Sequence, residues 1–133
     1  MKGFVHNGQA VRIVIGAGSL QYVQREIETL GARRALALST PDQRASAEMV
    51  ADLLGARAAG IFDRAVMHVP METAREAREV ARKLWADCAV AIGGGSTISL
   101  SKAIALHRAC DIAMKNQYPN PRPLERHALR ELL

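Results

Sequence analysis

The sequence predicts a doubly wound α/β domain with a mainly parallel sheet. Short apolar runs alternate with segments of helical periodicity, which is the pattern of strands joined by helical crossovers. The apolar run at 88–92 is continuous, as expected of a strand that helices cover on both faces. With 133 residues, 49% of them hydrophobic, the chain has the size and apolar content of one packed domain.

The chain is expected to open with a hairpin. Asn7-Gly8 lies between FVH and VRIVIG, and this pair tolerates the positive φ angles of a tight hairpin turn. A first helix is predicted next, with Gly31 as its left-handed C-terminal cap. Its expected apolar face consists of Leu20, Val23, Ile27 and Leu30. The run ALALS at 35–39 then predicts a buried strand.

A second helix begins after this strand. Thr40 is the expected N-cap, Pro41 the first helical residue and Gln43 the partner in a capping box, and Gly55 ends the helix. Its apolar residues are Ala45, Met49, Val50, Leu53 and Leu54.

A strand at 58–62 and a third helix after the MHVP segment complete the alternation before the strand at 88–92. The apolar residues of that third helix are Ala74, Ala77, Val80, Ala81, Leu84 and Trp85.

Three glycines follow the last strand, and a further helix follows the glycines. Ser96 or Thr97 is expected to cap that helix. Glycine lets the backbone approach a ligand closely, and a helix N-terminus offers unpaired N–H groups to an anion, so the junction predicts a phosphate site. The alternative is a glycine-rich turn that only permits tight packing. The spacing matches neither a Walker loop nor GxGxxG.

The segments VRIVIGAGSL, LGARRALALSTP, AVMHVP and AIGGGSTISLSKAIAL occur in this order. They resemble the N-terminal nucleotide-binding half of the iron-containing alcohol dehydrogenase superfamily, above all its maleylacetate reductase branch. Most members carry an aspartate where this chain has Ser99, and that departure is typical of the reductase branch. The resemblance implies a Rossmann-like NAD(P)-binding domain over residues 1–106.

The resemblance also implies the coenzyme site. The glycine segment would hold the pyrophosphate of NADH or NADPH, and Ser39 and Thr40 would lie beside the adenosine ribose. Because the position that is acidic in NAD-selective members is the neutral Thr40, we expect NADPH to be tolerated alongside NADH. The implied cofactor-binding residues are Gly93, Gly94, Gly95, Ser96, Ser39 and Thr40.

Residues 107–133 resemble the closing segment of the same reductases, with its NPRP followed by a short helix. The helical second domain expected between the two regions is missing from the sequence, so we expect a truncated chain with negligible turnover alone. A homodimer through the apolar stripe of this tail is a further expectation. The residues of that stripe are Leu124, Ala128 and Leu132.

No catalytic or metal-ligating residue is predicted. The four histidines form no HxxxH pair, and only His68 lies where a strand meets a helix. The favoured interpretation of His68 is a loop histidine bonded to backbone or water. Cys88 lies in a strand-like run and is expected to be a buried structural thiol. Two cysteines far apart, with no signal peptide, favour the cytoplasm.

Three functions remain open at this point. The first is an NAD(P)H-dependent oxidoreductase that, as the resemblance implies, reduces maleylacetate to 3-oxoadipate in the degradation of aromatic compounds. The second is a dinucleotide-binding module or partner domain without catalysis, and the third is a self-associating fragment without ligand. A net charge of +5 spread along the chain, with five aromatic residues, argues against nucleic acid as a partner, and no apolar run predicts a membrane span.

Overall fold

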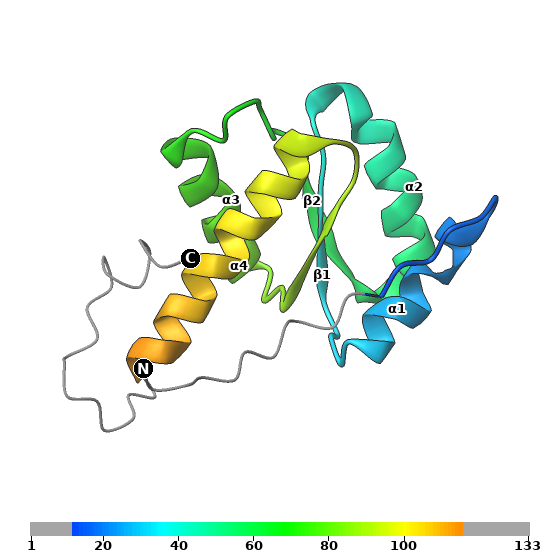
Figure 1. Ribbon diagram of the computed structural model, residues 1–133, viewed down its shortest axis with the longest axis horizontal. Coiled ribbons are helices and arrows are strands. Elements are labelled where there is room, and N and C mark those ends of the chain that lie inside the picture. The colour runs from blue at the N-terminus through cyan, green and yellow to red at the C-terminus, as the bar shows by residue number, and fades with distance from the viewer. Residues whose placement is uncertain (1–11, 116–133) are drawn as a thin grey trace, which may run out of the picture.

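The computed structural model describes residues 12–115, with side chains described for residues 12–105. Its sheet has three parallel strands in the order β2-β1-β3. The helices α1 and α2 cover one face of this sheet and α3 and α4 the other (Figure 1), which confirms the predicted doubly wound α/β fold. The strands are β1 (Ala35–Leu38), β2 (Ala58–Phe62) and β3 (Cys88–Ala91). The helices are α1 (Val23–Thr29), α2 (Arg44–Leu54), α3 (Met71–Lys83) and α4 (Gly95–Lys115).

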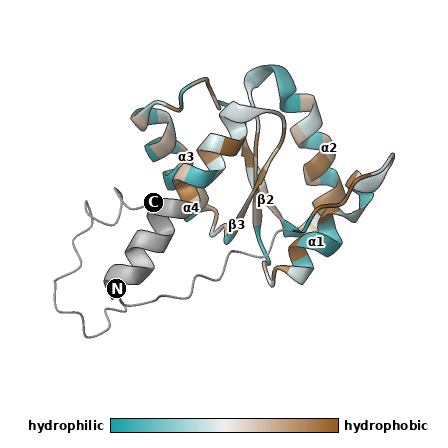
Figure 2. Ribbon diagram, viewed as in Figure 1, coloured by the Kyte–Doolittle hydropathy of each residue, from teal (hydrophilic) through white to brown (hydrophobic). Residues whose placement is uncertain are grey.

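The central strand β1 is buried along its whole length and supplies both halves of the core. Leu36 and Leu38 pack with Phe62 of β2 and Leu100 of α4 on one face of the sheet. Ala35 packs on the opposite face, in a second cluster with residues of α1 and α2. Figure 2 shows apolar colouring on the strands and more polar colouring on the helices around them. Only the inner faces of the helices meet the sheet, so their outer faces can be polar.

The predicted glycine cap of the first helix is confirmed. Gly31 has a φ of 72°, its N–H donates to the carbonyl of Glu28 at 2.9 Å, and the N–H of Ala32 donates to the carbonyl of Ile27 at 3.1 Å. This pair of bonds satisfies the last carbonyls of α1 in the Schellman arrangement, which needs a left-handed residue at this position.

Several residues predicted to lie on the buried apolar faces of the helices are exposed. Leu20 lies in a 3-10 turn before α1 and is 46% exposed, while Leu30 is the residue after the helix and is 77% exposed. Trp85 follows the end of α3 with a φ of 55° and is 81% exposed. Met49 and Leu53 of α2 are exposed as well. The three strands that the structure describes offer a narrow surface, so these residues at the helix ends and flanks stay partly or largely exposed.

The expected N-terminal hairpin lies mostly outside the described residues, including its Asn7-Gly8 turn. Residues 12–15 of its second arm form no strand. The NPRP segment and the rest of the tail from 116 also lie outside them. His107 lies inside α4, because this helix continues to Lys115 across the predicted boundary at 106. No helix within the described part of the chain is long and apolar enough to cross a membrane.

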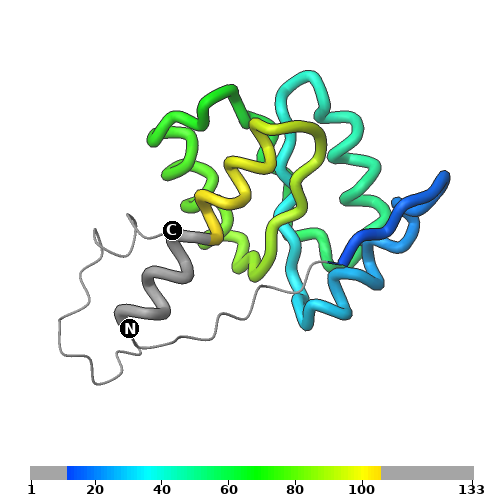
Figure 3. The backbone as a smooth tube through the Cα atoms, in the orientation of Figure 1, coloured from blue at the N-terminus to red at the C-terminus, as the bar shows by residue number. Residues whose placement is uncertain are grey.

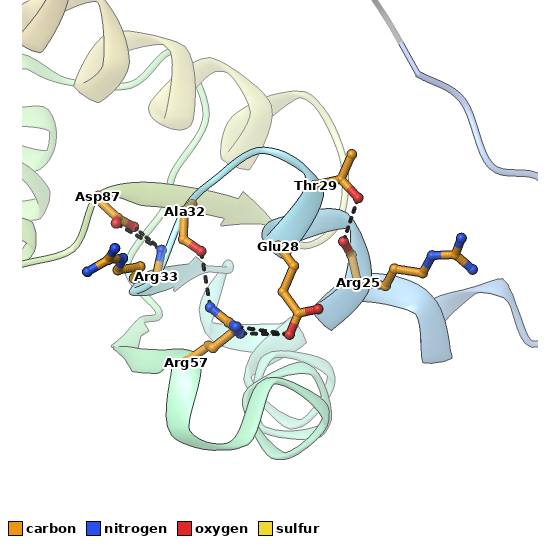
Figure 4. Close-up of polar contacts among 7 residues, drawn as sticks. All are labelled: Arg25, Glu28, Thr29, Ala32, Arg33, Arg57 and Asp87. Atoms are coloured by element: carbon orange, nitrogen blue, oxygen red, sulfur yellow. Dashed lines mark hydrogen bonds and ion pairs between the residues drawn. The ribbon is translucent and has the colours of Figure 1, made fainter.

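A polar clamp at the amino ends of β1 and β3 was not predicted (Figure 4). The Asp87 carboxylate accepts the N–H of Arg33 at 2.9 Å and the N–H of Arg34 at 2.9 Å. Beside it, Arg57 pairs with Glu28 at 2.9 Å and joins the start of β2 to the end of α1. These bonds fix how the strands begin, and therefore where their carboxyl ends emerge.

Candidate functional site

The sheet has a topological switch point between β1 and β3. The chain leaves β1 through α2 toward β2, and then returns through α3 to the other side of β1. Leu38 pairs with Ala91, and the N–H of Ile92 donates to the carbonyl of Leu38 at 2.8 Å. The segments after the two strands therefore leave the same end of the sheet side by side (Figure 3). Parallel α/β sheets bind ligands at this place.

The glycine loop after β3 has an exposed backbone at all three glycines. Gly93 has a φ of 113°, which disfavours any other residue. Gly94 and Gly95 differ, because a Cβ added to either would meet nothing within 4 Å and neither has a positive φ. The fold itself does not require glycine at these two positions. Their bare backbone instead leaves open space beside the N-terminus of α4, which favours the ligand-binding interpretation over a tight turn.

The predicted cap of α4 was wrong. The helix already begins at Gly95, so Ser96 and Thr97 lie in its first turn and not before it. Thr97 is fully buried, and its hydroxyl donates to the carbonyl of Gly94 at 2.9 Å. Starting the helix at glycine keeps the space before its first N–H groups free of side chains. Those N–H groups have no partner within the helix and attract anions.

The turn after β1 holds the other two predicted residues. Ser39 is fully buried; its N–H donates to the Phe62 carbonyl at 2.9 Å and its carbonyl accepts the Ala65 N–H at 3.0 Å. The Ser39 hydroxyl has no hydrogen-bond partner within the described residues. Thr40 is half-buried and precedes a 3-10 turn with Pro41 at its start, as predicted for an N-cap position.

The capping box predicted for this turn did not form. The Gln43 side chain does not reach the Thr40 N–H, and Thr40 makes no side-chain cap bond; instead the Thr40 hydroxyl donates to Gln43 Oε1 at 3.2 Å. The Gln43 carboxamide reaches the glycine loop: a Cβ added to Gly93 would lie 2.7 Å from its Cδ and 2.8 Å from its Nε2. Sequence reasoning missed this contact, because only the strand order brings the two segments together.

The charges beside the turn are paired. Arg44 donates to Glu48 at 2.9 Å and also to Asp63, which follows β2. The hydrogen bond from Arg44 lowers the pKa of the Asp63 carboxyl below its usual range. Because the guanidinium already serves two carboxylates, a phosphate near this turn would have to compete with them. Arg44 is therefore not free to bind a phosphate on the ribose without giving up one of these ion pairs.

The histidines and acids of the described residues do not build a metal centre. No three of the His, Cys, Asp and Glu side chains gather closely enough within the described part of the chain to hold an ion. His68 is exposed in the connection after β2 and has a φ of 63°. Its interpretation as a loop histidine bonded to backbone or water stays a prediction. His6 and His127 lie outside the described residues, as does the side chain of His107.

Cys88 was expected to be a buried thiol, but the structure leaves it only half-buried, because β3 is an edge strand of the described sheet. The Cys88 Sγ donates to the Arg34 carbonyl at 3.8 Å, and burial together with the Asp87 charge raises its pKa to about 11. A raised pKa keeps the thiol neutral at pH 8, so the reactive thiolate is roughly a hundredfold scarcer than at its ordinary pKa of 9.0. We expect slow alkylation of Cys88 by iodoacetamide at pH 8 and a steep rise toward pH 11, measured by peptide mass spectrometry. Rapid labelling at pH 8 in the folded protein would contradict this.

The described site can hold a dinucleotide diphosphate by its backbone. The N–H groups at the start of α4 provide the donors, and the open space at Gly94 and Gly95 provides the access. Ser39, which follows the neighbouring strand β1, adds a buried hydroxyl without a partner among the described residues. Buried hydroxyls without partners are rare and costly, so this one is consistent with a site that a ligand completes.

The family model of iron-containing alcohol dehydrogenases matches residues 10–129. The chain is 58% identical over 112 residues to a maleylacetate reductase from Burkholderia cepacia, covering 84% of this chain and 32% of that protein. It is 49% identical over 109 residues to a maleylacetate reductase from Pseudomonas sp. strain P51, covering 82% of this chain and 31% of that protein. The chain thus spans about a third of the length of the relatives it matches.

Solved structures of a maleylacetate reductase and of an iron-containing alcohol dehydrogenase also match this chain. The crystal structure of maleylacetate reductase from Agrobacterium tumefaciens superposes with a TM-score of 0.75 at 50% identity, over 82% of this chain and 31% of that one. An iron-containing alcohol dehydrogenase from Corynebacterium glutamicum superposes with a TM-score of 0.66 at 33% identity, over 79% of this chain and 29% of that one.

Proposed function

Because the chain belongs to the iron-containing alcohol dehydrogenase family, in its maleylacetate reductase branch, we propose that it forms the coenzyme-binding part of an NAD(P)H-dependent oxidoreductase. The observation that carries the proposal is the pair Gly94 and Gly95, two glycines that the fold does not need, at the switch point of the sheet. The reaction proposed for the whole protein is the reduction of maleylacetate, after the names of its relatives.

Each residue of the site has a proposed part in holding the coenzyme. The backbone of Gly93, Gly94 and Gly95 and the first turn at Ser96 would bind the diphosphate. The turn at Ser39 and Thr40 would lie beside the adenosine ribose. The bound nicotinamide would supply the hydride, and the protein would fix the orientation in which it meets the substrate.

The neutral turn predicts that both coenzymes bind. With no carboxylate at Thr40 to repel a 2′-phosphate, and with Arg44 engaged by two carboxylates, neither NADH nor NADPH gains a large advantage. We expect Kd values for the two coenzymes within about threefold of each other. The experiment is a thermal-shift titration, in which a ligand at a hundred times its Kd stabilises the folded state by about 2.7 kcal/mol.

A matched pair of variants tests the electrostatic reason. Thr40→Asp adds a negative charge beside the ribose and is expected to weaken NADPH about tenfold relative to NADH, whereas Thr40→Asn adds a similar volume without the charge and leaves the ratio unchanged. Failure of both coenzymes to shift the unfolding temperature would refute the proposed function. A strong preference for NADH in the wild type would refute only the account of selectivity.

A further inference from the structure

The side chain of Gln43 lies against the glycine loop without belonging to it. Its carboxamide occupies the side of Gly93 where any other residue would carry its Cβ: Oε1 is the atom nearest that position, with Cδ 2.7 Å and Nε2 2.8 Å from it. Gly93 thus gives room to a side chain from the neighbouring turn, in addition to its φ of 113°. The contact joins the two segments that leave β1 and β3 at the switch point.

The contact is weakly held. The hydrogen bond found for the carboxamide within the described residues comes from the Thr40 hydroxyl, at 3.2 Å, and both groups are neutral. Gln43 is only half-buried, and its amide is the far end of a flexible side chain. Rotation about its χ angles can therefore move the amide away from Gly93 without a change in the backbone.

Binding of a diphosphate gives that movement a function. An anion bound by the N–H groups at the start of α4 has to approach the backbone of the glycine loop, beside the position that the carboxamide covers. The same turn carries the buried Ser39 hydroxyl, which has no partner within the described residues.

We propose that Gln43 is a gate residue: its carboxamide covers the glycine loop at Gly93 in the free protein and turns aside when the coenzyme diphosphate binds. This inference rests on the proposed function. The apparent affinity equals the intrinsic affinity multiplied by the fraction of molecules in which the gate is open. Removing the gate therefore raises the apparent affinity without adding a contact.

The test compares Gln43→Ala with Gln43→Glu and with Gln24→Ala, an exposed glutamine of α1 that serves as control. Calorimetric titration with NADH is expected to give Gln43→Ala an affinity about three- to tenfold above wild type. Inorganic diphosphate, used as a second probe, is expected to gain similarly. Gln43→Glu keeps the acceptor for Thr40 and adds a charge that repels the diphosphate, so its affinity falls. Gln24→Ala matches wild type.

The other possible outcomes would refute either the gate alone or the proposed function together with the gate. If Gln43→Ala binds NADH more weakly than wild type, the amide is a ligand contact and the gate is refuted. If its affinity is unchanged, the carboxamide does not compete with the ligand and the gate is refuted as well. In both cases the proposed function survives, because the wild type binds. If neither wild type nor Gln43→Ala binds NADH or NADPH, the proposed function fails and the gate falls with it.

Discussion

Replacing Gly95 by alanine is expected to stabilise the free protein while weakening its binding of coenzyme at least about tenfold. A Cβ at this first residue of α4 meets no atom within 4 Å, and alanine favours a helix over glycine by about 0.5–1 kcal/mol. The added methyl group would occupy the space through which a diphosphate reaches the first N–H groups of the helix. Stability and binding would then change in opposite directions.

The measurement is thermal unfolding without ligand, followed by calorimetric titration of NADH. Gln24→Ala serves as the control, because it raises helix propensity on the exposed face of α1, away from the glycine loop. If Gly95→Ala bound NADH as tightly as wild type, the glycines would serve only to connect β3 and α4. The alternative interpretation of the glycine turn would then hold.

Leu38→Ala is expected to lower the free energy of unfolding by about 2–5 kcal/mol. Leu38 is fully buried at the carboxyl end of β1 and packs in the cluster that contains Phe62 and Leu100. Truncation removes buried methyl groups and leaves a cavity between the sheet and α4, in a small domain whose total stability is of similar size. Urea unfolding monitored by circular dichroism measures the loss.

Leu30→Ala is the matched control. This leucine belongs to the same residue type and was expected on the core face of the first helix, but it is 77% exposed. Its truncation is expected to change stability by less than about 0.5 kcal/mol. Equal losses for the two variants would mean that Leu30 is buried in solution and that the described packing of α1 is wrong.

Leu30 and Ile27 show what helical periodicity can predict and what it cannot. Helical spacing assigned Leu30 and Ile27 to one face, and the structure buries only Ile27, because the chain turns at the Gly31 cap before Leu30 can meet the sheet. Trp85 is exposed for the same reason at the end of α3. Apolar spacing identifies a helix better than its ends, since burial depends on what the helix packs against.

The candidate site could be predicted only in part from the sequence. A strand followed by GGGS places an exposed backbone before a helix in any parallel α/β sheet, so the position of Gly93, Gly94 and Gly95 could be predicted from local sequence. The first residue of the helix could not, because serine, threonine and glycine are all acceptable there. The structure begins α4 at Gly95 and uses Thr97 inside the buried first turn.

The sequence by itself determined the alternation of strands and helices, the glycine cap at Gly31 and the glycine loop, because each depends on residues close together in the chain. The tertiary structure alone decided the strand order β2-β1-β3. That order brings Gln43 against Gly93 and the Asp87 carboxylate against the start of β1, over separations of about fifty residues. Such contacts depend on which strands become neighbours, and local propensity carries no information about that choice.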